Sequence, residues 1–269
     1  MKIAVAGACG KMGSRIVRRA SLEGMQVVAL FEREDHPGIG KNAKEIIGID
    51  MGLKISGAES IEEVLKKTGA DVFVDFTRVD AARKNIEKAA NANVDMVIGT
   101  TGFIDEDMKR FEELSREKNF AMVVSPNMAV GVNLLFKISS ILSKSLKGYD
   151  IEIVEMHHRE KLDAPSGTAK KIAEIIAESL GKGRESIRFG RGQEYGKRDD
   201  CIYIHALRGG DIFGDHTVIF AGNGERIEIT HRATSRDAFV SGVIRAIRWV
   251  KNAKKGKVYS MFDVLEIEM

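Results

Sequence analysis

The chain has 269 residues, of which 43% are hydrophobic and 30% are charged, and it contains only three prolines. This composition is typical of a soluble globular protein and excludes the disordered and fibrous classes. Lysine and arginine number 42 against 39 acidic residues, so the net charge of +3 is too small to predict nucleic acid or an anionic membrane as a partner.

The two cysteines, Cys9 and Cys201, are far apart and lack the spacing of a zinc site, which argues against both a metal centre and a disulfide framework. A reducing cytoplasm is therefore the expected location. The N-terminus lacks the apolar region of a signal peptide, and no apolar run approaches membrane-spanning length. We expect a soluble, unexported protein with no membrane partner.

The first half of the chain alternates short apolar runs with amphipathic ones. This alternation predicts β-α-β units around a parallel sheet that is covered on both faces, with right-handed crossovers. The expected strands lie at 2–7, 26–31, 71–76, 95–102 and 120–126, and the clearest helices lie at 80–92 and 105–118.

The regular alternation of strands and helices ends after Asn127. A long helix is expected at 131–146, then a strand at 150–158 and a helix from about Ser166, followed by strands at 201–207, 216–222 and 225–233. Consecutive strands with few helices between them indicate an α+β domain with a mixed, mostly antiparallel sheet. A last amphipathic helix at 237–253, capped by Ser235 or Asp237, is expected to return to the first domain.

These patterns predict an α/β protein of two domains. Residues 1–127 and 237–269 are expected to form a Rossmann-type dinucleotide-binding domain. Residues 128–236 are expected to form a substrate-binding and oligomerisation domain.

A glycine motif follows the first strand directly and opens a helix expected to begin near Lys11. Glycines at this spacing allow a tight turn and a close approach to a pyrophosphate, whose charge the helix N-terminus stabilises. A glycine-rich turn that binds no dinucleotide is the alternative, and Cys9 by itself is interpreted as a small space-filling residue. The loop consists of Gly7, Ala8, Cys9, Gly10, Lys11, Met12 and Gly13.

An acidic and a basic residue follow at the end of the second expected strand. Glu32 lies 19 residues beyond Gly13, where a carboxylate accepts hydrogen bonds from the adenosine ribose. The guanidinium of the adjacent Arg33 is suited to a 2′-phosphate. The pair predicts tolerance of both NADH and NADPH.

The stretch EMHHREKLDAPSGTAKK at 155–171 concentrates histidine, arginine and lysine before a helix. In a strand, Glu155 and His157 point to one face while Met156 and His158 point to the other. One histidine is therefore able to face a ligand while its neighbour has another role, unless the strand ends and both turn into a cleft.

Ser166, Gly167 and Thr168 stand at the expected helix N-terminus, where backbone N–H groups and hydroxyls are available to an anion. With Lys161 they predict a binding site for a small dicarboxylate; a charged, solvated loop before a capped helix is the alternative. The adjacent histidines lack an H-E-x-x-H motif or a cysteine pair, so no metal site is predicted. His205, His216 and His231 are interpreted as structural.

The assembled motifs resemble the 4-hydroxy-tetrahydrodipicolinate reductase family, also called dihydrodipicolinate reductases, of the diaminopimelate route to lysine. The resemblance spans nearly the whole chain in order. It rests on GACGKMG at 7–13, GTTG at 99–102, SPNMAVGVN at 125–133, EMHHREKLDAPSGTA at 155–169 and RGGDIFGDHTVIFAGNGERIEITHRATSR at 208–236.

The resemblance implies an enzyme in which NADH or NADPH reduces the substrate ring. It implies His157 as proton donor or acceptor and Lys161 as its catalytic partner, with His158, Gly167 and Thr168 binding substrate and Ser166 in the same turn. The lysine and the backbone N–H groups suit two carboxylates, and a nearby histidine or lysine supplies the proton that neutralises the ring. Implied cofactor contacts are the loop Gly7 to Gly13, Glu32, Arg33, Gly99, Thr100, Thr101, Ser125, Pro126, Asn127 and Met128.

The resemblance also implies a homotetramer built through the second domain's sheet, and hinges near 126–130 and 235–240. Two other functions remain open on the residues alone. One is a dehydrogenase of an amino acid such as aspartate or homoserine, which shares the phosphate loop without requiring HHREKLDAPSGT. The other is a nucleotide-sensing regulatory protein, which predicts a degraded set of histidine and lysine, whereas both are present here.

Overall fold

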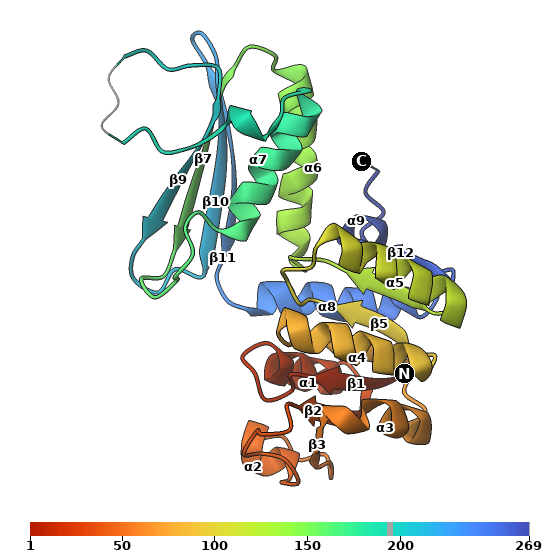
Figure 1. Cartoon of the computed structure of the whole chain (residues 1–269). Coiled ribbons are helices and arrows are strands. Elements are labelled where there is room, and N and C mark those ends of the chain that lie inside the picture. Colours follow the sequence, from red (N-terminus) through yellow and green to blue (C-terminus); the bar gives the residue numbers. More distant parts are fainter. Residues whose placement is uncertain (193–195, 269) are drawn as a thin grey trace. The chain divides into compact units, whose positions relative to one another are not determined.

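The computed structural model describes residues 1–192 and 196–268. The chain divides into two compact units (Figure 1). The first unit contains Met1–Ala129 and Phe239–Glu268, and the second contains Val130–Ala238.

A seven-stranded sheet forms the centre of the first unit. Every pairing in it is parallel, and the strand order is β12-β6-β5-β4-β1-β2-β3. The predicted parallel sheet is confirmed; β3 and β12, of three residues each, were not expected. The strands are β1 (Lys2–Ala6), β2 (Gln26–Glu32), β3 (Ile55–Gly57), β4 (Val72–Asp75), β5 (Asp95–Ile98), β6 (Ala121–Val124) and β12 (Lys257–Tyr259).

Helices cover both faces of this sheet because its strands are apolar on both sides. Ile3 and Val5 of β1 pack in one core with the apolar sides of α1 and α8, while Ala4 and Ala6 pack in a second core with α3, α4 and α5. The helices of this unit are α1 (Gly13–Leu22), α2 (Ala43–Ile47), α3 (Ile61–Thr68), α4 (Val79–Asn91), α5 (Asp105–Lys118), most of α8 (Asp237–Val250) and α9 (Met261–Val264).

The second unit has a five-stranded sheet in the order β11-β10-β7-β9-β8. Strand β10 is antiparallel to β11 and β7, whereas β9 is parallel to β7 and β8, so the sheet is mixed as predicted. The elements are α6 (Val130–Ser145), β7 (Asp150–His157), α7 (Gly167–Ser179), β8 (Ile187–Phe189), β9 (Ile202–Arg208), β10 (Gly214–Ala221) and β11 (Arg226–Ala233).

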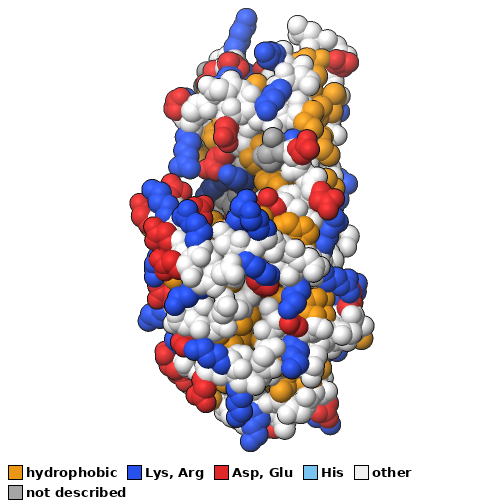
Figure 2. Space-filling view, turned by 90° about the vertical axis from the view of Figure 1, so that its right-hand side faces the viewer, with side chains coloured by type: hydrophobic (Ala, Val, Ile, Leu, Met, Phe, Trp, Pro, Cys, Tyr) orange, Lys and Arg blue, Asp and Glu red, His pale blue; other side chains and the backbone are white. Residues whose placement is uncertain are grey.

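Burial alternates along β7, so that Ile151, Ile153, Glu155 and His157 are buried while their neighbours are exposed or half-buried. This alternation places Glu155 and His157 on one face of the sheet. Hydrophobic side chains also remain on the surface of the second unit. Leu134, Ile138 and Ile141 of α6 are 40–49% exposed at a spacing that puts them on one side of the helix, and Figure 2 shows apolar side chains gathered on the side where α6 lies. Among the described residues, no helix has the length and apolar character that a membrane crossing requires.

Candidate active site

The loops of the predicted cofactor set share one edge of the first sheet. Strands β1, β2, β5 and β6 run parallel, and each is followed at its carboxyl end by one of these segments. The chain moves outward from β1 to β2 and β3, then resumes on the other side of β1 with β4. Such a switch point at the carboxyl edge is where open α/β sheets bind their ligands.

The glycine loop has the geometry of an anion cradle. Gly7 has φ of +72°, and a Cβ there would lie 2.8 Å from the Phe76 carbonyl oxygen. A Cβ on Gly13 would lie only 2.0 Å from the Gly7 carbonyl oxygen. Helix α1 begins at Gly13, two residues later than expected, and it has neither a side-chain cap nor an acidic residue in its first turn. The dipole of the helix start is therefore available to a phosphate, although the Ser14 N–H already donates to the Gly10 carbonyl over 3.1 Å.

Glu32 reaches back from the end of β2 to this loop. Its Oε1 accepts a hydrogen bond of 2.9 Å from the backbone N–H of Cys9. Burial, and secondarily the nearby carboxylate, raises the pKa of the Cys9 thiol to about 11, so the thiol is protonated at neutral pH. The Arg33 guanidinium is exposed and lies 2.9 Å from Asp35.

A cavity of about 510 Å³ opens beside the loop in the first unit. Four of the predicted cofactor residues line it: Gly7, Gly10, Glu32 and Arg33. The lining also includes basic side chains that the sequence analysis did not single out, namely Arg78, Lys84 and Lys88. The cavity therefore joins the phosphate loop to a lining of mixed charge, in which four basic side chains stand beside the four acidic ones Glu32, Glu34, Glu59 and Asp80.

The other predicted cofactor segments lie outside this cavity, at the ends of β5 and β6. The hydroxyl of Thr100 is buried and donates to Asp75 over 2.9 Å, and a Cβ on Gly99 would lie 2.1 Å from the Phe76 ring. Thr101 is exposed. The Thr100 side chain thus supports the edge of the sheet, whereas the exposed Thr101 is accessible to a ligand.

Asp75 is a buried acid that the sequence analysis did not find. It is fully buried and also accepts hydrogen bonds from Thr77 and Asn85. Burial raises its pKa despite these bonds. The network fixes the loop after β4, next to the glycine loop.

The segment Ser125–Met128 forms a tight turn after β6. The Ser125 hydroxyl donates to the Asn127 carbonyl over 2.8 Å, and Asn127 Oδ1 accepts from the N–H of Ala129 over 2.9 Å. Pro126 is exposed, whereas Met128 is 2% exposed and belongs to the core. The Met128 side chain is therefore a packing group.

His157 lies at the end of β7 in a buried ionic network of the second unit. Its Nδ1 lies 2.5 Å from Oε2 of Glu155, which is fully buried. Arg208, which pairs with His157 across β7 and β9, donates from both terminal nitrogens to the two Glu155 oxygens at 2.8 Å. The N–H of Ser166 adds a bond of 3.0 Å to Oε1.

These partners determine the charge of Glu155. Burial alone raises the pKa of a carboxyl, but the hydrogen bonds from His157, Arg208 and Ser166 outweigh burial and lower the pKa of Glu155 from 4.5 to about 2. An ionised carboxylate held against Nδ1 orients the His157 ring. The other nitrogen, Nε2, lies beside Gly214, where a Cβ would approach within 3.0 Å.

His216 of β10 is next to His157, with ring centroids 5.2 Å apart. Its Nε2 is 3.0 Å from the Ser166 hydroxyl, and its Nδ1 has no hydrogen-bond partner within the described chain. Burial, reinforced by the neighbouring His157, lowers the pKa of His216 to about 3. His216 is thus a neutral ring in contact with both His157 and the start of α7.

The remaining predicted substrate residues surround the N-terminus of α7. Ser166 is the cap and accepts from the N–H of Ala169, while Gly167 is exposed and Thr168 is half-buried. Lys161 Nζ lies 2.7 Å from Asp163, and the N–H of Lys161 donates to the His158 carbonyl. The fold brings His157 and Ser166 together through Glu155. The Lys161 ammonium is paired with Asp163, so a substrate carboxylate that binds Lys161 must replace the Asp163 carboxylate.

Sequence reasoning placed Glu155 on the His157 face but gave it no role, and it did not single out Arg208. The two-residue alternation of β7 was the available signal for Glu155. Arg208 gave no such signal, because its position depends on the register of β9 against β7.

Comparison with known proteins follows the same division of the chain. Residues 1–128 match the family model described as dihydrodipicolinate reductase, N-terminus, and residues 131–265 match the one described as dihydrodipicolinate reductase, C-terminus. Proteins named 4-hydroxy-tetrahydrodipicolinate reductase from Methanocaldococcus jannaschii and Methanococcus aeolicus are 51% and 46% identical, with 98% and 99% of this chain and 97% and 99% of those relatives covered. The structure of dipicolinate-bound dihydrodipicolinate reductase from Paenisporosarcina sp. TG-14 is 30% identical with a TM-score of 0.76, and 98% of each chain is covered.

Proposed function

We propose, since the chain belongs to the dihydrodipicolinate reductase family, that it catalyses the NAD(P)H-dependent reduction of 4-hydroxy-tetrahydrodipicolinate to tetrahydrodipicolinate in the diaminopimelate route to lysine. The observation that carries this proposal is the Glu155–Arg208–His157 network beside the α7 N-terminus. An amino-acid dehydrogenase needs no such network, and a sensor without chemistry has no use for it.

The first unit is proposed to hold the reduced dinucleotide. The uncapped start of α1 and the loop Gly7–Gly13 suit the pyrophosphate, and Glu32 suits the adenosine ribose. The backbones of Gly99–Thr101 and Ser125–Met128 are proposed to complete the site. When bound, the nicotinamide supplies the hydride.

The second unit is proposed to bind the dicarboxylate and handle the proton. Gly167, Thr168 and Lys161 suit one carboxylate through N–H groups and an ammonium, with His158 and Ser166 beside them. His157 is proposed as the proton donor through Nε2, because its Nδ1 is held by Glu155. The proton neutralises the negative charge that hydride addition places on the ring.

Both NADH and NADPH are proposed as cofactors. Glu32 favours a free ribose hydroxyl, whereas Arg33 favours a 2′-phosphate, for which it would exchange its exposed ion pair with Asp35. An exposed pair of this kind contributes about 0–1 kcal/mol, so the exchange is inexpensive.

A cytoplasmic homotetramer is proposed as the working form. The face of the second sheet opposite Glu155 carries Val154, Met156, Thr217 and Ile219, which are only half-buried in the single chain. Burial of such apolar surface stabilises association. Light scattering of the purified protein, with Val154→Arg as the disrupting variant, measures this directly; a monomeric wild type contradicts the proposal.

The decisive experiment follows the absorbance of reduced nicotinamide with substrate made in situ from pyruvate and aspartate semialdehyde by the preceding synthase. NADH and NADPH are supplied separately. We expect rapid oxidation by the wild type and slow oxidation by His157→Gln, with little change in cofactor affinity. An absence of oxidation despite demonstrable cofactor binding removes the reductase assignment.

A further inference from the structure

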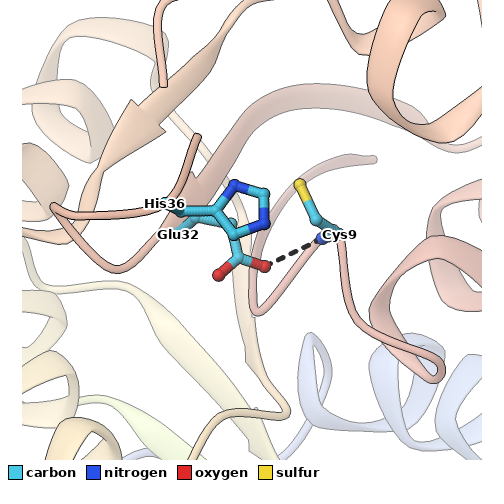
Figure 3. Close-up of side chains that lie close together, drawn as sticks. All are labelled: Cys9, Glu32 and His36. Carbon is cyan, nitrogen blue, oxygen red and sulfur yellow. Dashed lines mark hydrogen bonds between the residues drawn. The ribbon is translucent and has the colours of Figure 1, made fainter. Parts of the chain in front are cut away.

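Three side chains of different kinds converge at the rim of the glycine loop. Cys9 lies in the loop, Glu32 ends β2, and His36 lies in the turn that follows β2. One ligand atom of each lies within 4.8 Å of the other two, and all three residues are half-buried (Figure 3). Sequence spacing did not predict this cluster, because Cys9 is 23 residues from Glu32 and only the fold brings them together.

The orientation of each side chain leaves one ligand atom available. The N–H of Gly38 donates to Nδ1 of His36 over 3.1 Å, so Nε2 is the remaining nitrogen. Figure 3 shows the imidazole ring turned with a nitrogen toward Cys9 and Glu32. Glu32 accepts the Cys9 N–H with Oε1 and a longer hydrogen bond of 3.4 Å from the Arg33 N–H with Oε2. A carboxylate oxygen has a second lone pair, so Oε2 is still able to bind a cation beside the Cys9 sulfur.

We infer that Cys9, Glu32 and His36 form a binding site for a thiophilic divalent cation such as Zn²⁺, and that an ion bound there excludes the dinucleotide. Thiolate, carboxylate and imidazole are each zinc ligands, and three protein ligands with an open fourth position match the arrangement of catalytic zinc sites. Thiolate and carboxylate together neutralise the ion. The exclusion of the dinucleotide rests on the proposed function, in which Glu32 binds the adenosine ribose. A Glu32 carboxylate that coordinates the ion is no longer available to that ribose.

Binding requires small and definable adjustments. Tetrahedral zinc places one sulfur, one nitrogen and one oxygen ligand about 3.4–3.6 Å apart, so the three side chains must close by roughly 1 Å. The Cys9 thiol releases its proton to solvent as the sulfur–metal bond forms. A neutral ring that coordinates through Nε2 carries its proton on Nδ1, so the hydrogen bond from the Gly38 N–H is lost when the ion binds. We therefore expect a dissociation constant on the order of 1 μM, weaker than that of preformed structural zinc sites.

Co²⁺ is the probe for the test, because a thiolate ligand gives it a charge-transfer band in the near ultraviolet. The chain has two cysteines, so Cys9→Ser is expected to abolish the band and the matched control Cys201→Ser to retain it. His36→Asn removes the metal-facing nitrogen while its amide oxygen remains able to accept from Gly38. We expect this variant to weaken Co²⁺ and Zn²⁺ binding at least tenfold and to leave metal-free activity unchanged.

Exclusion is measured separately by titrating Zn²⁺ against the wild type at rising NADH. NADH at 100 times its own dissociation constant is expected to raise the apparent Zn²⁺ dissociation constant about 100-fold. A missing band, a band that survives in Cys9→Ser, or unchanged affinity in His36→Asn overturns the metal site. Zn²⁺ affinity that does not respond to NADH overturns exclusion. Because the Co²⁺ titration needs neither substrate nor turnover, it gives its result even if the reductase assay fails.

Discussion

Replacing Glu155 by glutamine tests the buried network with an isosteric change. The variant keeps the volume but removes the charge that faces Arg208 and His157, and its amide N–H groups oppose those of Arg208 and Ser166. A carboxyl pKa lowered from 4.5 to about 2 corresponds to about 3 kcal/mol in favour of the ionised form. Removing one partner of a buried ion pair typically costs about 3–5 kcal/mol. We expect the variant to lose about 3 kcal/mol of unfolding free energy at pH 7.

The pH dependence has a definite sign. Because the folded-state pKa of Glu155 is lowered, its stabilisation is complete above pH 4.5 and is lost as the pH falls toward about 2. The deficit of Glu155→Gln relative to the wild type should therefore shrink through that window. Turnover at neutral pH should fall by about 10²- to 10⁴-fold, as when an orienting carboxylate is removed from a catalytic histidine. The affinity for NADH should not change.

Urea unfolding followed by circular dichroism measures the free energy, with Glu62→Gln as the control. The Glu62 carboxylate forms an exposed i,i+4 ion pair with Lys66 on helix α3. We expect the control to lose no more than about 1 kcal/mol. A loss below 1 kcal/mol in Glu155→Gln, or full turnover in that variant, would refute the account of the network.

Other predictions concern single contacts. Gly214→Ala places a methyl group 3.0 Å from His157 Nε2 and should lower turnover at least tenfold while NADH binding, measured by fluorescence, is retained. Arg33→Ala should reduce kcat/KM about tenfold for NADPH and less than twofold for NADH, and equal losses would remove its role in reading a 2′-phosphate. His216 has a lowered pKa of about 3, so the folded state resists its protonation and stability falls as the pH drops below 6.5. The wild type should lose about 2 kcal/mol between pH 8 and pH 5 from this source, and urea unfolding of His216→Gln at both values should lack that difference.

The fold class was predictable because its signals are local. Apolar runs and amphipathic helices reveal a parallel sheet with two covered faces, and the structure confirms the five expected strands of the first unit. The three-residue strands β3, β8 and β12 are too short for any periodicity to register. They form because each pairs with the edge of a longer strand, β3 with β2, β8 with β9 and β12 with β6.

The residues of the candidate site likewise fall into those that a local sequence pattern predicts and those that only strand pairing brings to the site. His157, Lys161 and the α7 cap stand in one contiguous stretch and could be read from it. Arg208 and His216 reach that stretch only through the register of β9 and β10 against β7. Asp75 likewise gave no signal, because an acid at the end of an apolar run has the same sequence pattern whether it is exposed or buried.

Strand β12, at one edge of the first sheet, has a consequence for synthesis on the ribosome. Strand β12 pairs with β6, yet the whole second unit is translated between them. Until Lys257–Tyr259 leaves the exit tunnel, the nascent chain exposes β6 as an open edge, and the core lacks Met261 and Val264, which are buried in the finished protein. Unpaired edges template aggregation. The second unit is therefore synthesised in full before the sheet of the first unit is complete. Premature termination before residue 257 should yield insoluble fragments.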